Sequence, residues 1–110
     1  MALVDLMTRP GNGRGWTEFL VKELLDIKIK MYQEKGHAKP HVHIDYGIDK
    51  HAASYAIPEG TRLVGNLSRK YDKSIGLWIQ ENQELLLQLW SQAQEGKPIE
   101  SIILQIRERT

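Results

Sequence analysis

Three of the four histidines of this chain lie within seven residues, at His37, His41 and His43. Histidine is the side chain whose unperturbed pKa lies nearest to neutrality, and its neutral imidazole is the commonest metal ligand in proteins. Polar and apolar residues alternate from His41 to Tyr46, which is typical of a half-buried strand. The pattern therefore predicts two imidazoles on one face of a sheet, where they could transfer protons or bind a metal.

Acid–base cleavage of RNA is one chemistry that this histidine segment allows. Such cleavage needs a general base for the 2′-hydroxyl, a general acid for the leaving oxygen and cations for the developing charge. His41 and His43 are the candidate catalytic residues, and the reaction would need neither a metal nor a cofactor. The sequence does not decide whether the protein is an enzyme.

A metal site made of His37, His41 and His43 is an alternative. Residues i and i+2 of a strand lie about 6.5–7 Å apart on one face, so His41 and His43 could share one ion. We expect no metal to bind, because the loop over residues 33–39 holds His37 only loosely.

Composition limits the remaining choices. The chain has 110 residues, of which 41% are hydrophobic and 26% charged, as in an ordinary globular domain. It has no apolar run long enough to span a membrane and no signal sequence, so a cytoplasmic location is expected. The absence of cysteine excludes disulfides and thiolate chemistry. A net charge of only +1 means that nucleic acid would have to be bound by a local patch.

The expected architecture is α+β: a four-stranded antiparallel meander with one long C-terminal helix packed on its apolar face. A flexible arm is expected over residues 1–15, and a single domain over 16–110. Residues 17–25 fit either a short N-terminal helix or an early strand. Strands are predicted at 27–32, 41–46, 51–57 and 61–65. The helix begins at Ser68 and ends before Gly96, with Asn82 as a point where it could kink or divide, and a docked tail follows.

Matching the buried positions across the sheet predicts which residues pair. The predicted pairs of the first hairpin are Tyr32 with His41, Lys30 with His43, and Lys28 with Asp45. Those of the second hairpin are His43 with Ser54, Asp45 with Ala52, and His41 with Ala56. Arg62 is expected on the same side, which the helix leaves open. The candidate contacts to RNA or phosphate are therefore Lys28, Lys30, Tyr32 and Arg62.

Other readings of this face remain. Antiparallel sheets commonly expose one polar face to solvent without further function. The face could also belong to a non-enzymatic module, antitoxin-like or structural, in which the histidines only shape the hairpin. An exposed apolar patch would favour such a protein-interaction role.

From about residue 27 to 103, the chain resembles a small bacterial family known as domain of unknown function 4160. The resemblance lies in the stretch from His37 to Gly47, in Gly65-Asn66-Leu67, and in the segment from Trp78 to Trp90. Lys39 stands where the family has the first of two prolines. The resemblance implies a compact α+β protein, often encoded beside another small protein in gene pairs that look like toxin–antitoxin modules. The expected partners are accordingly RNA or a cognate small protein, and a homodimer is an alternative.

Overall fold

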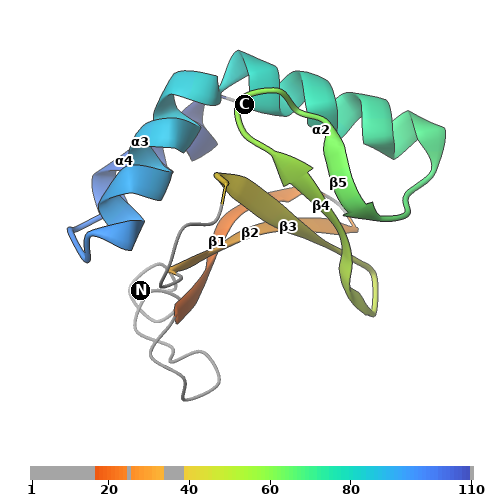
Figure 1. Cartoon of the computed structure of the whole chain (residues 1–110), viewed down its shortest axis with the longest axis horizontal. Helices are drawn as coiled ribbons and strands as arrows, with labels where there is room; N and C mark the ends of the chain where they lie inside the picture. The colour runs from red at the N-terminus through yellow and green to blue at the C-terminus, as the bar shows by residue number, and fades with distance from the viewer. Residues whose placement is uncertain (1–16, 25, 34–38, 110) are drawn as a thin grey trace.

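The computed structural model describes residues 17–24, 26–33 and 39–109, so the predicted arm and His37 lie outside the described residues. Its centre is a five-stranded antiparallel sheet whose strands follow one another in chain order (Figure 1). The strands are β1 (Thr17–Leu24), β2 (Ile27–Gln33), β3 (His41–Tyr46), β4 (Asp49–Ala56) and β5 (Arg62–Gly65). The prediction of an α+β meander is confirmed, but four strands was one too few.

The additional strand is β1, where the helix alternative is wrong and the strand alternative is correct. Phe19 pairs with Met31 of β2, and both side chains are buried. The pairing shifts between Leu20 and Lys22, where a β-bulge inserts one extra residue. This bulge interrupts the period-two alternation, which explains why the sequence pattern of this segment is ambiguous.

The central pairings follow the predicted register. Lys28 pairs with Asp45 and Lys30 with His43, while His41 and His43 pair with Ala56 and Ser54 of β4. The ladder between β3 and β4 is irregular between Ile44 and Tyr46, so the predicted pair of Asp45 with Ala52 does not form. The predicted pair of Tyr32 with His41 is also not part of the ladder, which ends at Lys30 and His43.

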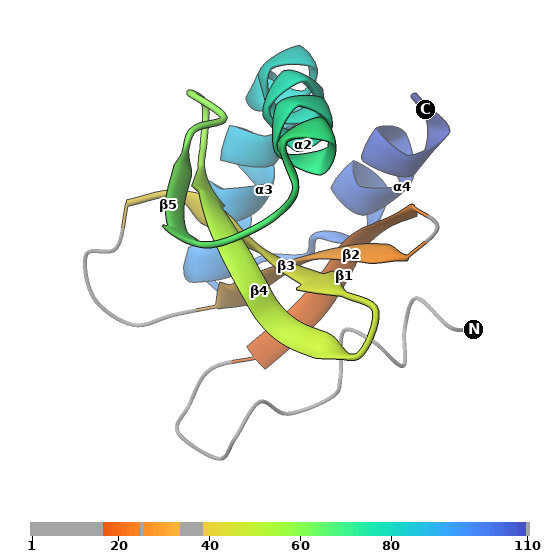
Figure 2. The same ribbon diagram turned by 90° about the vertical axis from the view of Figure 1, so that its right-hand side faces the viewer.

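Helices cover one face of the sheet, as predicted, but the expected long helix is divided (Figure 2). The helices are α2 (Arg69–Glu81), α3 (Gln83–Gln94) and α4 (Glu100–Glu108). Asn82 ends α2 with φ −112° and ψ 18°, and its side-chain amide donates to the carbonyl of Trp78 at 2.9 Å. None of these three helices is long and apolar enough to cross a membrane.

The core lies between the sheet and the helices. Ile29, Ile44 and Tyr55 of the sheet are fully buried beside Leu89 of α3 and Ile103 of α4. Helix α3 contacts β2 and helix α4 contacts β1. The predicted docking of the C-terminal tail is therefore confirmed, with α4 as the docked element. This packing leaves the other face of the sheet for polar side chains.

The loop between β4 and β5 contacts α2 through two glycines. Gly60 has φ +76°, and a Cβ atom at this position would lie 2.5 Å from the carbonyl oxygen of Gly76. The reverse holds for Gly76, where a Cβ atom would lie 2.9 Å from the oxygen of Gly60. The Gln80 side chain also donates to the carbonyl of Glu59 at 2.9 Å. Backbone contact at this distance requires that both residues lack a side chain.

Candidate functional site

The structure brings His41 and His43 together on the face of the sheet that carries Lys30. Their rings are in edge-to-face contact with centroids 4.9 Å apart, and we call them the imidazole pair. The ring of Tyr32, on β2, lies 4.6 Å from that of His43. Both imidazoles are half-buried, so this end of the face is accessible to solvent. These three aromatic side chains form a continuous row of ring contacts across β2 and β3, in which Tyr32 is buried and the imidazoles are half-buried.

His41 is held from two sides. Its Nδ1 atom lies 2.6 Å from the carbonyl oxygen of Lys39, and only a protonated nitrogen can donate to a carbonyl. In the neutral ring, Nε2 is then the proton acceptor. The indole of Trp90, from α3, lies 5.2 Å from the imidazole on another side. The backbone and the helix together therefore fix both the tautomer and the position of His41.

Behind the imidazole pair lies a charged network, which we call the Lys30 cluster: Glu18, Lys30, Tyr32 and Asp45. The Lys30 ammonium lies 2.8 Å from Asp45 Oδ2 and 3.4 Å from Glu18 Oε1. The Tyr32 hydroxyl donates to Glu18 Oε2 at 2.7 Å. The Lys30 side chain is 15% exposed and that of Asp45 only 6%. The expectation of an open face is therefore wrong at this position, because its charges are paired and largely withdrawn from water.

Two groups of the Lys30 cluster have shifted pKa values. Burial raises the pKa of Glu18, but the hydrogen bond from Tyr32 and the charge of Lys30 outweigh it and lower that pKa overall. Burial lowers the pKa of Lys30, but the hydrogen bond with Asp45 and the charge of Glu18 raise it overall. Both shifts keep the pair ionised, so the cluster stabilises itself and leaves little positive charge for a ligand.

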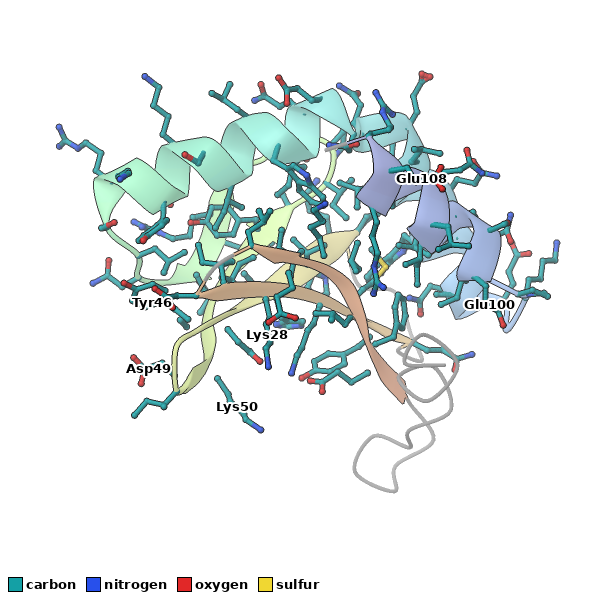
Figure 3. The ribbon with its side chains drawn as sticks, turned by 180° about the vertical axis from the view of Figure 1, so that it is seen from behind. Lys28, Tyr46, Asp49, Lys50, Glu100 and Glu108 are labelled. Carbon is teal, nitrogen blue, oxygen red and sulfur yellow. The ribbon has the colours of Figure 1, made fainter. Side chains whose placement is uncertain are left out.

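Lys28 is an exposed cation on this face. It lies two positions before Lys30 on β2, and Figure 3 shows it on the side of the sheet turned away from the helices. Among the described residues, no carboxylate forms an ion pair with it. Asp45 pairs with Lys28 in the ladder, but its carboxylate bonds to Lys30 instead.

The prediction that Arg62 shares this face is wrong. Its guanidinium bonds to Asp72 of α2 at 3.2 Å, and the Tyr55 hydroxyl donates to the same carboxylate oxygen at 2.5 Å. We call Tyr55, Arg62 and Asp72 the Arg62 cluster. The β4–β5 ladder shifts between Ser54 and Tyr55. A shift of one residue moves a side chain to the opposite face, which places Arg62 on the helix side.

The residues that the structure describes contain no group of three histidine, aspartate or glutamate side chains arranged to hold a metal ion. The predicted trio includes His37, which lies outside the described residues. The other two members of the trio, His41 and His43, contact Tyr32, Trp90 and a backbone carbonyl.

Two residues of this region were missed from the sequence. Glu18 pairs with Tyr32 across β1 and β2, and this pairing depends on the bulge between Leu20 and Lys22, so even a strand predicted over residues 17–24 would not have revealed it. Trp90 lies at helical spacing among apolar residues, a pattern that predicts a core position and no contact with a histidine. It is 8% exposed, and its contact with His41 depends on where α3 crosses the sheet, which no local pattern records.

The sequence model of the family described as Domain of unknown function (DUF4160) matches residues 26–91. The chain belongs to this family. The match covers β2 to α3, and thus the imidazole pair with Tyr32, Lys30 and Asp45. Strand β1 and helix α4 lie outside it and contact each other. Comparison with curated proteins and with solved structures gives no match.

Proposed function

We propose that this family member engages RNA as part of a toxin–antitoxin-like pair, and cleaves it by acid–base catalysis with His41 and His43. The observation that carries the proposal is the half-exposed imidazole pair, with ring centroids 4.9 Å apart. Two imidazoles in contact can supply one base and one acid without a metal. The gene-pair context is the one that the family resemblance implies.

The roles of the two histidines follow from the contact of His41 with the Lys39 carbonyl. Because Nδ1 donates to that oxygen, the neutral ring presents Nε2 as the base for the 2′-hydroxyl. His43 then protonates the leaving 5′-oxygen. Attack of the 2′-oxygen on phosphorus breaks the bond to the 5′-oxygen, and yields a 2′,3′-cyclic phosphate and a 5′-hydroxyl end.

The cation in this proposal is Lys28 and not Lys30 or Arg62. Lys30 and Arg62 each bond to a carboxylate, whereas Lys28 is exposed. Lys28 lies on the same strand face as Lys30, about 6.5–7 Å along the strand. One exposed cation supports weak, salt-sensitive binding of a single-stranded substrate.

The test uses labelled single-stranded RNA with EDTA at low salt. We expect cleavage to products with a cyclic phosphate, and no cleavage when the RNA carries 2′-O-methyl groups. His41→Gln and His43→Gln should each reduce the rate by about 100-fold or more. His51→Gln is the matched control, since it removes a histidine from outside the imidazole pair. Absence of cleavage, or unchanged rates in the first two variants, would contradict the proposal.

A second candidate is a protein-interaction module, which the exposed strand β5 favours. This strand forms one edge of the described sheet, and its Leu63 and Val64 are 47% and 68% exposed. An edge strand offers unpaired backbone groups to a strand of another protein. Val64→Lys should abolish co-purification with the product of the neighbouring gene. Leu104→Lys, at an exposed leucine of α4, is the control.

A further inference from the structure

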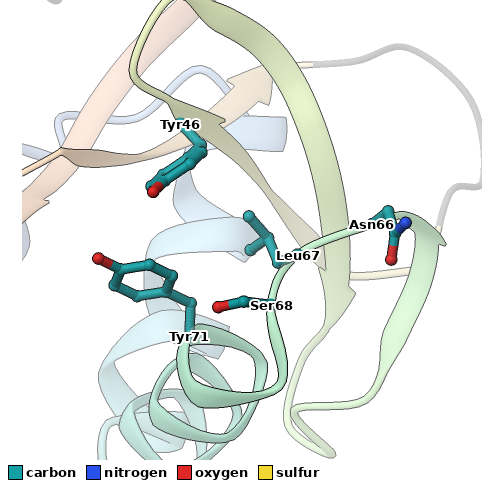
Figure 4. Close-up of a pocket in the computed structure, with 5 residues that line it drawn as sticks. All are labelled: Tyr46, Asn66, Leu67, Ser68 and Tyr71. Atoms are coloured by element: carbon teal, nitrogen blue, oxygen red, sulfur yellow. The ribbon is translucent and has the colours of Figure 1, made fainter.

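Two cavities lie along α2, on the helix-covered side of the sheet and away from the imidazole pair. The first has a volume of about 170 Å³ and is lined by Leu24, Ile27, Ile29, Lys70, Tyr71, Ser74, Ile75 and Trp78. The second has a volume of about 300 Å³ and is lined by Tyr46, Asn66, Leu67, Ser68 and Tyr71 (Figure 4). Tyr71 belongs to both linings, so the cavities adjoin at its ring.

The first cavity is mainly apolar. Its walls are aliphatic side chains of β1 and β2 on one side, and Ile75 and Trp78 of α2 on the other. An engineered apolar cavity of about 150 Å³ holds a benzene molecule, so the volume here fits one aromatic ring. The chemistry of the walls therefore selects a ring or a ring-sized apolar group.

Polar groups of this first cavity lie along a single line on α2. Lys70, Ser74 and Trp78 are spaced four residues apart, so they share one face of the helix. Lys70 and Ser74 are exposed, whereas Trp78 is 7% exposed and its indole Nε1 finds no hydrogen-bond acceptor among the residues that the structure describes. The line thus runs from a cation in solvent to a buried donor that lacks a partner. The apolar walls accept a ring and Lys70 attracts an anion, so a ligand that combines a ring with a carboxylate fits both features.

The second cavity adds neutral hydrogen-bonding groups. The rings of Tyr46 and Tyr71 lie 5.3 Å apart and tilted by 51°, and Figure 4 shows their hydroxyl groups on the same side, away from Leu67 and Ser68. All five lining residues are uncharged. This chamber therefore suits a neutral polar substituent on the ring, and the carboxylate belongs at Lys70.

We propose that the two cavities form a binding site for a small aromatic carboxylate, with the ring beside Ile75 and Trp78 and the carboxylate at Lys70. The site is independent of RNA cleavage, since it shares no residue with the imidazole pair or Lys28. Binding would fix the first turns of α2 against the β1–β2 hairpin, because the walls come from both.

The experiment titrates the full chain with phenylacetate and with its neutral analogue phenylacetamide. Calorimetry measures affinity, and ¹H–¹⁵N correlation spectra follow the indole N–H of Trp78. We expect saturable binding of phenylacetate that shifts the Trp78 signal, with weaker binding of the amide. Lys70→Gln should weaken phenylacetate binding by roughly two- to fivefold, as expected for a partly exposed ion pair. Lys73→Gln removes a lysine of the same helix that does not line the cavity, and should have no effect.

A third variant tests the cavity itself. Ser74→Leu places a larger side chain at an exposed lining position, and should reduce affinity at least tenfold while the melting temperature stays near that of the parent chain. Equal affinity for acid and amide, or equal effects of Lys70→Gln and Lys73→Gln, would overturn the carboxylate assignment. An unchanged Trp78 signal at saturation, or no binding of either probe, would overturn the site.

Discussion

The Lys30 cluster and the Arg62 cluster use the same chemistry on opposite faces of the sheet. In each, a tyrosine hydroxyl and a cation bond to one carboxylate. They differ in solvent access: the side chains of Lys30, Glu18 and Asp45 are 15%, 25% and 6% exposed, whereas those of Arg62 and Asp72 are 36% and 37% exposed. Water can replace a lost partner in the second cluster but not readily in the first. The same set of bonds should therefore contribute very differently to stability.

The largest expected contrast comes from removing the most buried carboxylate of the Lys30 cluster, Asp45, and the single carboxylate of the Arg62 cluster, Asp72. Asp45→Ala leaves the Lys30 ammonium largely buried with a single, longer contact to Glu18, and should lower the free energy of unfolding by about 2–4 kcal/mol. Asp72→Ala removes the corresponding group from the Arg62 cluster and should cost about 1 kcal/mol or less. Urea denaturation of both variants measures the difference. Equal losses would show that burial does not separate the two clusters.

Acid pH provides a second contrast, through Glu18. Its pKa in the folded state lies below its ordinary value of 4.5, so it contributes stability that is present above that value. This contribution is lost as the pH falls through the folded-state pKa. Glu18→Gln should therefore flatten the decline of stability below about pH 4.5, as followed by thermal melting from pH 6 to pH 2.5. Glu84→Gln, at an exposed position of α3, serves as the control and should keep the decline of the parent chain.

The smallest expected effects are those of substitutions at Lys28 and Arg62, which should differ in RNA affinity and not in stability. Arg62→Gln should change stability by less than about 0.5 kcal/mol and leave RNA affinity unchanged, because its charge faces Asp72. Lys28→Gln should also leave stability unchanged, but should weaken RNA binding and reduce its dependence on salt by about one unit of slope. Fluorescence anisotropy at several salt concentrations measures both. A loss of RNA affinity in Arg62→Gln would contradict this prediction and show that Arg62 contributes to RNA binding.

The sequence predicted the central pairs of β2, β3 and β4 because apolar and polar residues alternate regularly over the paired stretches, up to the irregularity after Ile44. Matching Ile29 with Ile44 fixes the partners of Lys30 and His43 at the same time. The orientation of Arg62 could not be predicted, since the shift beside Tyr55 inserts a residue that no alternation reveals. The same holds for β1, whose bulge leaves the carbonyls of Leu20 and Val21 to accept hydrogen bonds from Arg107 of α4.

The contacts of the candidate site also fall into those that the sequence predicts and those that it does not. The imidazole pair follows from local spacing along one strand, so residue order alone brings it together. The neutralisation of Lys30 depends on Glu18, which comes from a strand that the sequence pattern left ambiguous. The contact of Trp90 with His41 depends on the end of α2 at Asn82, because this break redirects α3 across the sheet. Contacts that depend on the angle between two elements cannot be predicted from the periodicity of hydrophobic residues.

The glycine contact between the β4–β5 loop and α2 also bears on how the molecule fluctuates. The backbones of Gly60 and Gly76 are in contact, so the middle of α2 and this loop should open as one unit. Their amide protons should therefore exchange slowly and at similar rates. Before Gly76, the described residues of α2 make no such backbone contact. These first turns border the two cavities and are joined to the sheet through the side chain of Asp72, which bonds to Tyr55 and Arg62. Amide protons over residues 72–75 should then exchange with deuterium sooner than those over residues 79–81. The part of α2 before Gly76 can therefore open locally, while the part after Gly76 stays packed against the loop.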